Sequence, residues 1–172
     1  MTITAPNARR HVDQDIFRDV IGNFTSGVAV ITTNHADSRF AVTASAVSSL
    51  SMDPPMLLVC LNRRLATADA VSDSGVFAVN ILAEDQGELA AQFATRHPDK
   101  FRGVQTAEGK LGVPVLATAL AYLECRVTER VDVATHSVFM AEVQNAASQP
   151  GKPLAYFRSR FGRFNDAIDE RM

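Results

Sequence analysis

The sequence predicts a mostly β domain in which an antiparallel barrel is decorated by a few helices. Six or seven strand-like runs are separated by turn residues, and several of the connections are too short for the helical crossover that a parallel sheet needs. Only three segments have helical spacing of their apolar residues. With 172 residues, 47% of them hydrophobic, the chain is long enough for one domain with a sizeable core.

The first helical segment begins at Asp13, a residue type suited to cap a helix N-terminus. Five apolar residues follow at spacings of one, three and four, which places them on one helical face: Ile16, Phe17, Val20, Ile21 and Phe24. We expect this helix to end near residues 25–27, where a glycine follows polar residues. Residues 1–12 are expected to form a flexible arm, and residues 13–172 a single domain.

Strand-like runs and two further helices occupy the rest of the chain. The runs are residues 28–33, 40–51, 56–61, 76–82, 121–133, 137–143 and 154–157. Residues 134–136 are expected to join two of these runs as a hairpin. A helix over residues 65–74 should end at Gly75, and a second helix is expected over residues 84–95. Residues 97–114 are expected to form a polar loop, and a basic and aromatic tail follows the last strand.

Composition argues against several classes of protein. The formal net charge is −2 and there is no basic excess, so nucleic-acid binding is not expected. No apolar run approaches the roughly 20 residues of a membrane span, and the first fifteen residues lack the apolar stretch of a secretory signal. The two cysteines lie in separate apolar runs, which favours reduced thiols in or near the core. We therefore expect a cytoplasmic protein without a membrane contact.

The sequence also lacks the common catalytic and metal-binding motifs. Its four histidines are isolated from one another, so no metal site is expected. There is no Gly-x-Gly-x-x-Gly and no Gly-x-Ser-x-Gly, and the stretch from Gly103 to Lys110 departs from a P-loop in its glycine spacing. An organic cofactor held by a fold other than the Rossmann fold is consistent with these absences.

The run of small residues over 43–49 is the most unusual stretch of the chain. Small side chains let a ligand lie against the backbone, and hydroxyl and N–H groups can hydrogen-bond a heterocycle or a phosphate. A crowded pair of strands in a tight barrel would also select small residues, so composition alone leaves both interpretations open.

Motifs in a fixed order carry a resemblance to a known family. They are Phe24-Thr25-Ser26-Gly27-Val28, Val42-Thr43-Ala44-Ser45, Ser48-Ser49-Leu50-Ser51-Met52-Asp53-Pro54-Pro55, Leu58-Val59-Cys60-Leu61-Asn62, Gly75-Val76-Phe77-Ala78-Val79-Asn80, Asp99-Lys100-Phe101, His136 and Pro153-Leu154-Ala155-Tyr156-Phe157-Arg158. Over roughly residues 15–163 the chain resembles the flavin reductase-like family, the small components of two-component flavin-dependent monooxygenases. The resemblance implies the FMN-binding split β-barrel, an antiparallel Greek-key fold, and a homodimer.

The resemblance also implies an activity. A member of this family transfers a hydride from NADH or NADPH to FMN or FAD, and the reduced flavin diffuses to a partner monooxygenase. Two other functions remain open at this point: an oxidase with tightly bound FMN, and a flavin- or haem-binding split-barrel protein without enzymatic activity.

The family resemblance assigns candidate site residues by position. Those implied for cofactor binding are Thr43, Ala44, Ser45, Ser49, Ser51, Asp53, Pro54, Pro55, Asn62, Thr67, Arg96, Lys100, Phe101, Tyr156 and Arg158. His136 is implied to position the nicotinamide, although Ala134 and Thr135 replace the Gly-Asp that often precedes this histidine in relatives.

Several of these residues also have a structural interpretation. Asp53 can cap a turn, Asn62 can end a strand and Thr67 can lie at a helix N-terminus. Lys100 can be a solvated charge, Phe101 a core residue and His136 a polar turn residue. The arginines after Tyr156 can contact cofactor phosphates, or they can be surface charges beside aromatic residues of a dimer interface.

Overall fold

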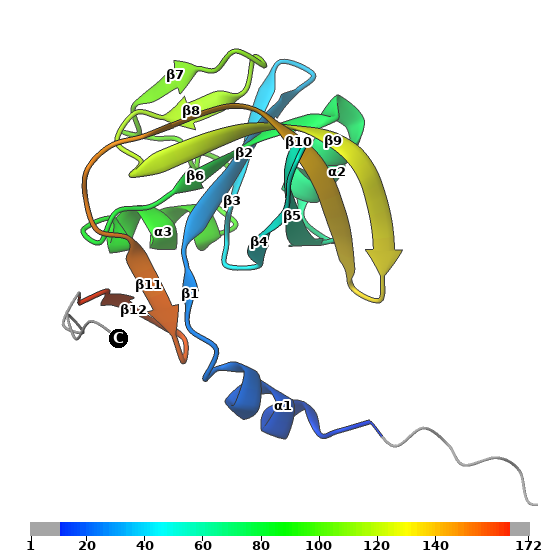
Figure 1. Ribbon diagram of the computed structural model, residues 1–172, viewed down its shortest axis with the longest axis vertical. Coiled ribbons are helices and arrows are strands. Elements are labelled where there is room, and N and C mark those ends of the chain that lie inside the picture. Colours follow the sequence, from blue (N-terminus) through cyan, green and yellow to red (C-terminus); the bar gives the residue numbers. More distant parts are fainter. Residues whose placement is uncertain (1–10, 166–172) are drawn as a thin grey trace, which may run out of the picture.

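The computed structural model describes residues 11–165, which form three helices and twelve strands (Figure 1). Most of the expected N-terminal arm lies outside the described residues. The elements are α1 (Gln14–Ile21), β1 (Ser26–Gly27), β2 (Ala29–His35), β3 (Ser38–Ala44), β4 (Val47–Met52), β5 (Pro55–Asn62), α2 (Ala66–Ser74), β6 (Val76–Ile81), α3 (Gly87–Ala94), β7 (Thr106–Glu108), β8 (Pro114–Leu116), β9 (Ala121–Val133), β10 (His136–Ser148), β11 (Leu154–Phe157) and β12 (Arg160–Arg163).

The main sheet has seven strands in the order β3-β2-β6-β9-β10-β5-β4, and every neighbouring pair is antiparallel. Two small sheets, β1-β11-β12 and β7-β8, complete the β structure of the described residues. The mostly β, antiparallel fold expected from the sequence is confirmed. The long hairpin of β9 and β10, which turns at Ala134 and Thr135 as expected, projects from the body in Figure 1.

Alternation along β5 shows which face of the main sheet is the core. Leu57, Val59 and Leu61 are buried, whereas the residues between them are half-buried on the opposite face. Inside, aliphatic side chains pack with Phe77 and Phe139, and Val71 of α2 joins this cluster. A second cluster places Phe93 of α3 against β2 and β11. The two helices therefore cover different parts of the barrel.

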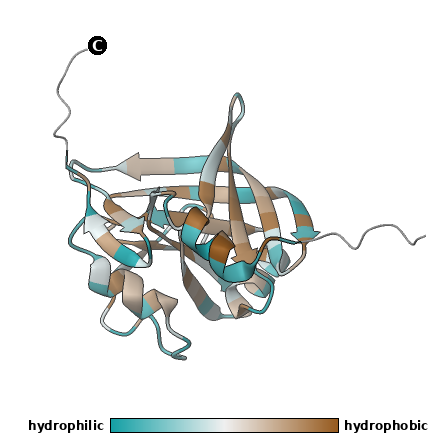
Figure 2. Cartoon of the chain, turned by 90° about the horizontal axis from the view of Figure 1, so that it is seen from below, coloured by the Kyte–Doolittle hydropathy of each residue, from teal (hydrophilic) through white to brown (hydrophobic). Residues whose placement is uncertain are grey.

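Helix α1 begins as expected, because the Asp13 carboxylate accepts hydrogen bonds from the backbone N–H groups of Asp15 and Ile16. It ends earlier than expected, at Ile21, with Gly22 as its C-cap. None of its residues is buried, and Figure 2 shows hydrophobic colouring on this exposed helix. Within residues 11–165, two contacts with Arg158 link it to the body: the Arg158 N–H donates to the Gly22 carbonyl at 3.2 Å, and the Arg158 guanidinium lies 3.5 Å from the Asp19 carboxylate.

Four other segments differ from the sequence expectation. Residues 40–51 are two strands rather than one, because the chain leaves β3 after Ala44 and re-enters the sheet at Val47. The helix expected from residue 84 begins at Gly87, because a bridge between Ala83 and Pro153 and a hydrogen bond from Ala83 N–H to Gln86 Oε1 hold the preceding turn. The expected loop over 97–114 contains β7 and the start of β8, and the tail after Phe157 returns as β12.

A buried amide fixes the β7–β8 hairpin to the barrel. The Asn80 side chain donates to the Val30 carbonyl and to Thr32 Oγ1, both at 3.0 Å, and accepts from Leu116 N–H at 2.8 Å. The Thr32 hydroxyl in turn donates to the Pro114 carbonyl. Because every polar group of this network has a partner, a buried asparagine is compatible with the core.

A buried carboxylate holds the loop between β7 and β8. Glu124 is fully buried, and it accepts hydrogen bonds from Leu111 N–H and from the Asn145 amide, both at 2.7 Å. Burial alone would raise the pKa of this carboxyl, but these hydrogen bonds and the nearby Lys110 hold the pKa below its ordinary value. Gly109 leaves room for the carboxylate, since a Cβ there would lie 2.4 Å from Glu124 Oε2.

Both cysteines are free thiols, as expected. Cys125 is buried, and desolvation with a contribution from the Glu124 charge raises its pKa to about 12, so this thiol is held in its unreactive neutral form. Cys60 is half-buried on β5. Among residues 11–165, no helix has the length and apolar character needed to cross a membrane.

Candidate functional site

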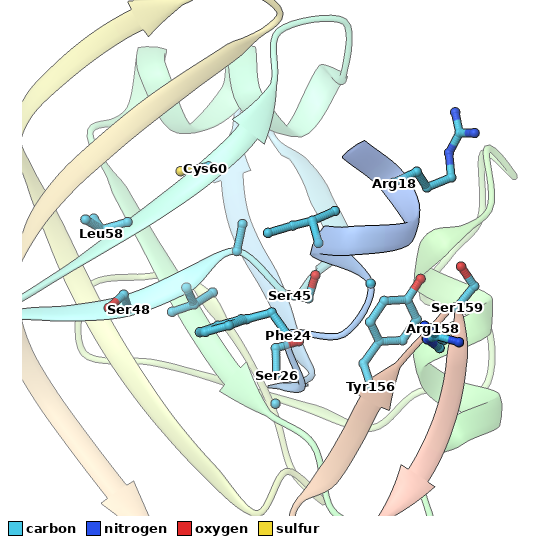
Figure 3. Close-up of a pocket in the computed structure, with 15 residues that line it drawn as sticks. Arg18, Phe24, Ser26, Ser45, Ser48, Leu58, Cys60, Tyr156, Arg158 and Ser159 are labelled. Atoms are coloured by element: carbon cyan, nitrogen blue, oxygen red, sulfur yellow. The ribbon is translucent and has the colours of Figure 1, made fainter. Parts of the chain in front are cut away.

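A hollow of about 580 Å³, here called the central pocket, lies where α1, β4, β5 and β11 meet (Figure 3). Its lining combines small and hydroxyl-bearing residues with two arginines and two aromatic rings: Arg18, Ile21, Gly22, Phe24, Ser26, Gly27, Ser45, Ala46, Val47, Ser48, Leu58, Cys60, Tyr156, Arg158 and Ser159. Residues 45–48 of the small-residue run therefore form one wall of a cavity, a position that is compatible with the ligand-binding interpretation of that run.

Local strand geometry explains this wall. Since β3 ends at Ala44 and β4 begins at Val47, Ser45 and Ala46 lie outside the strands and are exposed. On β5, the alternation that buries Val59 turns Leu58 and Cys60 to the other face, where they line the pocket. Arg158 and Ser159 adopt left-handed backbone conformations, with φ of 46° and 63°, at the turn between β11 and β12. This turn presents both residues to the central pocket.

A smaller side pocket of about 270 Å³ adjoins the central pocket, with which it shares Ser45 and Tyr156. Thr43 and Ala44 line it, together with Phe161, whose ring lies 5.9 Å from that of Tyr156. The Thr43 hydroxyl donates to the Ala90 carbonyl at 2.6 Å, so this side chain also ties β3 to α3. The predicted ring-binding residues Thr43, Ala44 and Ser45 thus lie together, with Tyr156 beside them.

A third hollow of about 550 Å³, here called the basic pocket, brings together four more of the predicted residues. Thr67 lies in the first turn of α2, whereas Arg96, Lys100 and Phe101 come from the loop after α3. Arg39 also lines this pocket, and its guanidinium lies 4.5 Å from the centre of the Phe101 ring. Sequence reasoning did not single out Arg39.

Lys100 has a structural role in the basic pocket. Its ammonium group donates to the carbonyls of Ala41 and Phe93, both at 3.1 Å. Partial burial lowers its pKa below the usual lysine value. No side chain caps the N-terminus of α2, which leaves the N–H groups of its first turn, beside Thr67, without a side-chain acceptor. The α2 N-terminus, together with Arg39 and Arg96 in the same lining, favours an anion in the basic pocket.

His136 and Asn62 lie opposite each other in the β10–β5 register, at the base of the β9–β10 turn. His136 is exposed, and its Nδ1 lies 2.8 Å from the Thr135 hydroxyl. Asn62 Oδ1 accepts from Arg64 N–H at 3.0 Å. Neither residue lines the pockets described above.

The turn at His136 is braced by Asp132. Its carboxylate accepts from the Arg130 guanidinium at 2.9 and 3.0 Å and from the Ser137 hydroxyl at 2.7 Å. These hydrogen bonds lower the pKa of Asp132, and Arg63 adds its charge at 3.7 Å. The Arg63 N–H also donates to the Thr135 carbonyl at 3.0 Å.

The predicted residues of the β4–β5 turn form a fourth group, outside the pockets described. The Ser51 hydroxyl accepts from Asp53 N–H at 3.2 Å, and the peptide bond between Asp53 and Pro54 is cis. Pro55 begins β5 opposite Met52, and Ser49 pairs with Leu57. The structure therefore divides the predicted site residues among the central and side pockets, the basic pocket, the His136–Asn62 region and this turn.

Several lining residues of the central pocket were not predicted as site residues. Phe24 and Ile21 were assigned to the apolar face of a helix, and Arg18 lies on that helix. Ser48 belongs to the small-residue run, which was the one signal in the sequence that pointed to this wall. Within residues 11–165, no group of three or more His, Cys, Asp or Glu side chains is arranged to hold a metal ion.

Comparison with protein families gives a match to the flavin reductase like domain over residues 21–165. Among characterised proteins, the reductase component of a 4-nitrophenol 4-monooxygenase/4-nitrocatechol 2-monooxygenase from Rhodococcus opacus is 46% identical over 158 residues. That alignment covers 92% of this chain and 85% of the relative.

Solved structures give the same relationship. Nitrilotriacetate monooxygenase component B from Mycobacterium thermoresistibile superposes with a TM-score of 0.88 at 32% identity, covering 93% of this chain and 91% of that one. An NADH:FAD oxidoreductase from Streptomyces globisporus, solved with NAD and FAD fragments, gives a TM-score of 0.86 at 30% identity, covering 91% and 96%.

Proposed function

The chain belongs to the flavin reductase-like family, and on that premise we propose that it uses NADH or NADPH to reduce FMN or FAD for a separate monooxygenase. We further propose that the flavin is an exchangeable substrate, which leaves in reduced form and diffuses to that partner. We also propose that residues 13–172 form the catalytic domain. The protein is proposed to act in the cytoplasm, where reduced pyridine nucleotides are regenerated.

The central pocket is the observation that carries the assignment of the flavin site. Its volume of about 580 Å³ lies within the range of roughly 300–1,000 Å³ typical of small-molecule sites. Ser45 and Ser48 offer hydroxyl and backbone groups along one wall, and Tyr156 offers an aromatic ring. A flat heterocycle with polar edges fits this donor set, so we assign the flavin ring system to the Ser45 side of the pocket.

The basic pocket supports an assignment for the phosphate group. Arg39, Arg96 and Lys100 converge there with the first turn of α2, and cations at a helix N-terminus favour an anion. We assign the flavin phosphate to this pocket, with Thr67 as a hydroxyl donor. Asn62 and the Ser51–Pro55 turn remain proposed contributors through the family resemblance.

When bound, the flavin supplies the redox chemistry, because it accepts a hydride from the reduced nicotinamide. The residues of this chain bind and orient the two ring systems, and none of them has to act as a general acid or base. We propose that His136, held at the base of the β9–β10 turn by the braced Asp132 region, contacts the nicotinamide.

We propose that two copies of the chain associate. Ile16, Phe17 and Val20 on α1 are between 57% and 64% exposed, and Val131 and Val133 expose apolar side chains on β9. A second copy that covers these residues would remove them from water, and exposed apolar residues in such number are typical of interaction surfaces. Sedimentation analysis that gives a monomer of 18.6 kDa at micromolar concentration would contradict this proposal.

A substitution at Ser45 tests the position of the flavin site. Ser45 is exposed, its side chain makes no hydrogen bond within residues 11–165, and it lines both the central and the side pocket. Ser45→Leu therefore fills the cavity at little cost in stability. We expect the Kd for FMN, measured by quenching of flavin fluorescence, to rise at least tenfold. The matched control is Ser148→Leu at the exposed end of β10, another serine whose side chain makes no hydrogen bond within residues 11–165, and it should leave the Kd unchanged. Equal Kd values in both variants would contradict the assignment.

A further inference from the structure

His136 lies on the same face of the main sheet as the central pocket. On β5, the alternation that buries Leu61 turns Cys60 and Asn62 to the opposite face, and Cys60 lines the central pocket. His136 is the register partner of Asn62, and partners in neighbouring strands share a face of the sheet. Asn62 follows Cys60 by two residues, which is about 7 Å along a strand. The His136 side chain therefore lies near the edge of the central pocket.

The alternation along β10 agrees with this placement. Ser137 and Phe139 are buried on the core side, whereas His136 is exposed and Val138 is half-buried on the other side. Val138 is the register partner of Cys60, which Figure 3 shows on β5 at the central pocket. A strip of side chains on one face of the sheet therefore leads from Cys60 past Val138 to His136.

The backbone of the β9–β10 turn is held in place before and after the turn. Val133 pairs with His136, so the turn itself consists of Ala134 and Thr135. Ala134 has a left-handed φ of 50°, which reverses the chain within this short connection. The Arg63 N–H donates to the Thr135 carbonyl at 3.0 Å and ties the turn to the end of β5. The Thr135 side chain therefore projects from an anchored backbone.

Among residues 11–165, the Thr135 hydroxyl is the one hydrogen-bond partner of the His136 ring, and its oxygen lies 2.8 Å from Nδ1. This hydroxyl makes no other hydrogen bond within the part of the chain that the structure describes, so its proton is available to Nδ1. In a neutral imidazole one nitrogen donates and the other accepts. A hydroxyl that donates to Nδ1 leaves the ring proton on Nε2. The partner at Nδ1 thus determines both the direction of the ring and the atom that it offers to a ligand.

We propose that Thr135 is a positioning residue for hydride transfer, and this inference rests on the proposed function. Its hydroxyl donates to Nδ1 of His136 and orients the imidazole so that the Nε2–H faces the edge of the central pocket. From there the Nε2–H donates to the carboxamide oxygen of the nicotinamide. The direction of the ring affects the rate because the nicotinamide must lie over the flavin in a defined orientation when the hydride is transferred.

Thr135→Val removes the hydroxyl and keeps the size and branching of the side chain. At saturating flavin, the kcat/KM for the reduced nucleotide should fall roughly 3- to 10-fold, as expected for the loss of one hydrogen bond between neutral groups. The KM for flavin should not change. Thr135→Ser keeps the hydroxyl and should restore most of the lost kcat/KM. The matched control is Thr128→Val on β9, which also removes one exposed hydrogen bond, from the hydroxyl to the Met140 carbonyl at 3.1 Å, and should leave kcat/KM unchanged.

A double-mutant cycle determines whether Thr135 acts through His136. Because His136→Ala removes the ring, adding Thr135→Val to it should cause no further loss of kcat/KM. The nitrogen chemical shifts of the His136 ring in alkaline solution test the same hydrogen bond without turnover, and the signals are assigned by their absence from His136→Ala. They should show Nε2 protonated in the unaltered protein and in Thr135→Ser, and a mixture of the two tautomers in Thr135→Val.

Turnover of the unaltered protein with FMN or FAD tests the proposed function separately. In a protein that reduces flavin, the inference is overturned if Thr135→Val lowers kcat/KM no more than Thr128→Val does. It is also overturned if Thr135→Ser is as impaired as Thr135→Val, because the loss would then come from the turn and not from the hydroxyl. A double variant slower than His136→Ala would contradict an action through His136, and an unchanged kcat/KM in His136→Ala would remove the group on which Thr135 is proposed to act. A ring proton on Nδ1 in the unaltered protein would contradict donation by the hydroxyl.

Discussion

Gly109→Ala is expected to destabilise the protein, because the added methyl group occupies the place of a buried carboxylate. A Cβ at this position would lie 2.4 Å from Glu124 Oε2 and 2.6 Å from its Cδ, distances that no real contact allows. The backbone at Gly109 is not left-handed, so alanine introduces no conformational strain of its own. The effect of the substitution is therefore confined to Glu124.

The magnitude follows from what Glu124 must give up. If its carboxylate moves away, it loses the hydrogen bonds from Leu111 N–H and the Asn145 amide. A hydrogen bond to a charged group contributes about 1.5–3 kcal/mol, and local relaxation recovers part of the loss, so we expect a decrease of about 2–4 kcal/mol in the free energy of unfolding. For a chain of this length, that corresponds to a fall of roughly 5–15 °C in Tm.

Urea denaturation and differential scanning calorimetry measure this change. The matched control is Gly162→Ala, whose Cβ meets no atom within 4 Å and which should change the free energy of unfolding by less than about 0.5 kcal/mol. Combining Gly109→Ala with Glu124→Ala should be less damaging than the sum of the two changes, because the clash and the carboxylate disappear together. A Gly109→Ala protein as stable as the control would contradict a clash between the added methyl group and the Glu124 carboxylate.

Three further substitutions test other parts of the structure. The pKa of Glu124 is lower in the folded chain than its ordinary value of 4.5, so its carboxylate stabilises the fold above pH 4.5, and this stability is lost as the pH falls through the folded pKa. Glu124→Gln should therefore flatten the acid limb of a plot of unfolding free energy against pH, and an unchanged limb would argue against this role. Lys100→Met should raise the KM for flavin several-fold while Lys110→Met leaves it unaltered, whereas equal KM values would remove the basic pocket from the site. Asp19→Asn breaks the link to Arg158 and should accelerate amide exchange in α1; unaltered exchange would mean that this ion pair does not hold the helix.

The sequence predicts those elements whose signals are local. The Asp13 cap, the left-handed Gly75 at the end of α2 and the β9–β10 hairpin all depend on a few neighbouring residues, and all three are present. The predicted start of α3 was wrong by three residues, because Pro153, which is distant in sequence, pairs with Ala83. The second strand of the C-terminal hairpin was missed because Arg160–Arg163 is exposed along its whole length and has no apolar alternation.

The candidate site shows the same division between local and long-range information. The small-residue run pointed to Ser45 and Ser48 because their side chains are unusual in a strand-like stretch. The other walls of the central pocket could not be identified from local sequence patterns, since Phe24, Cys60 and Tyr156 come from distant segments and each has an ordinary structural interpretation. The division of the predicted residues among the pockets and turns depends on tertiary packing, which local patterns do not contain.

Steady-state oxidation of the pyridine nucleotide, over the four pairings of NADH or NADPH with FMN or FAD, is the direct test of flavin reductase activity. The protein freed of flavin by gel filtration should oxidise the nucleotide slowly by itself, and adding at least one of the two flavins should increase the rate by more than tenfold, with saturation at micromolar flavin. The reduced flavin should then pass through a dialysis membrane to a monooxygenase on the other side under anaerobic conditions. If no flavin accelerates the oxidation of either nucleotide, the chain is not a flavin reductase.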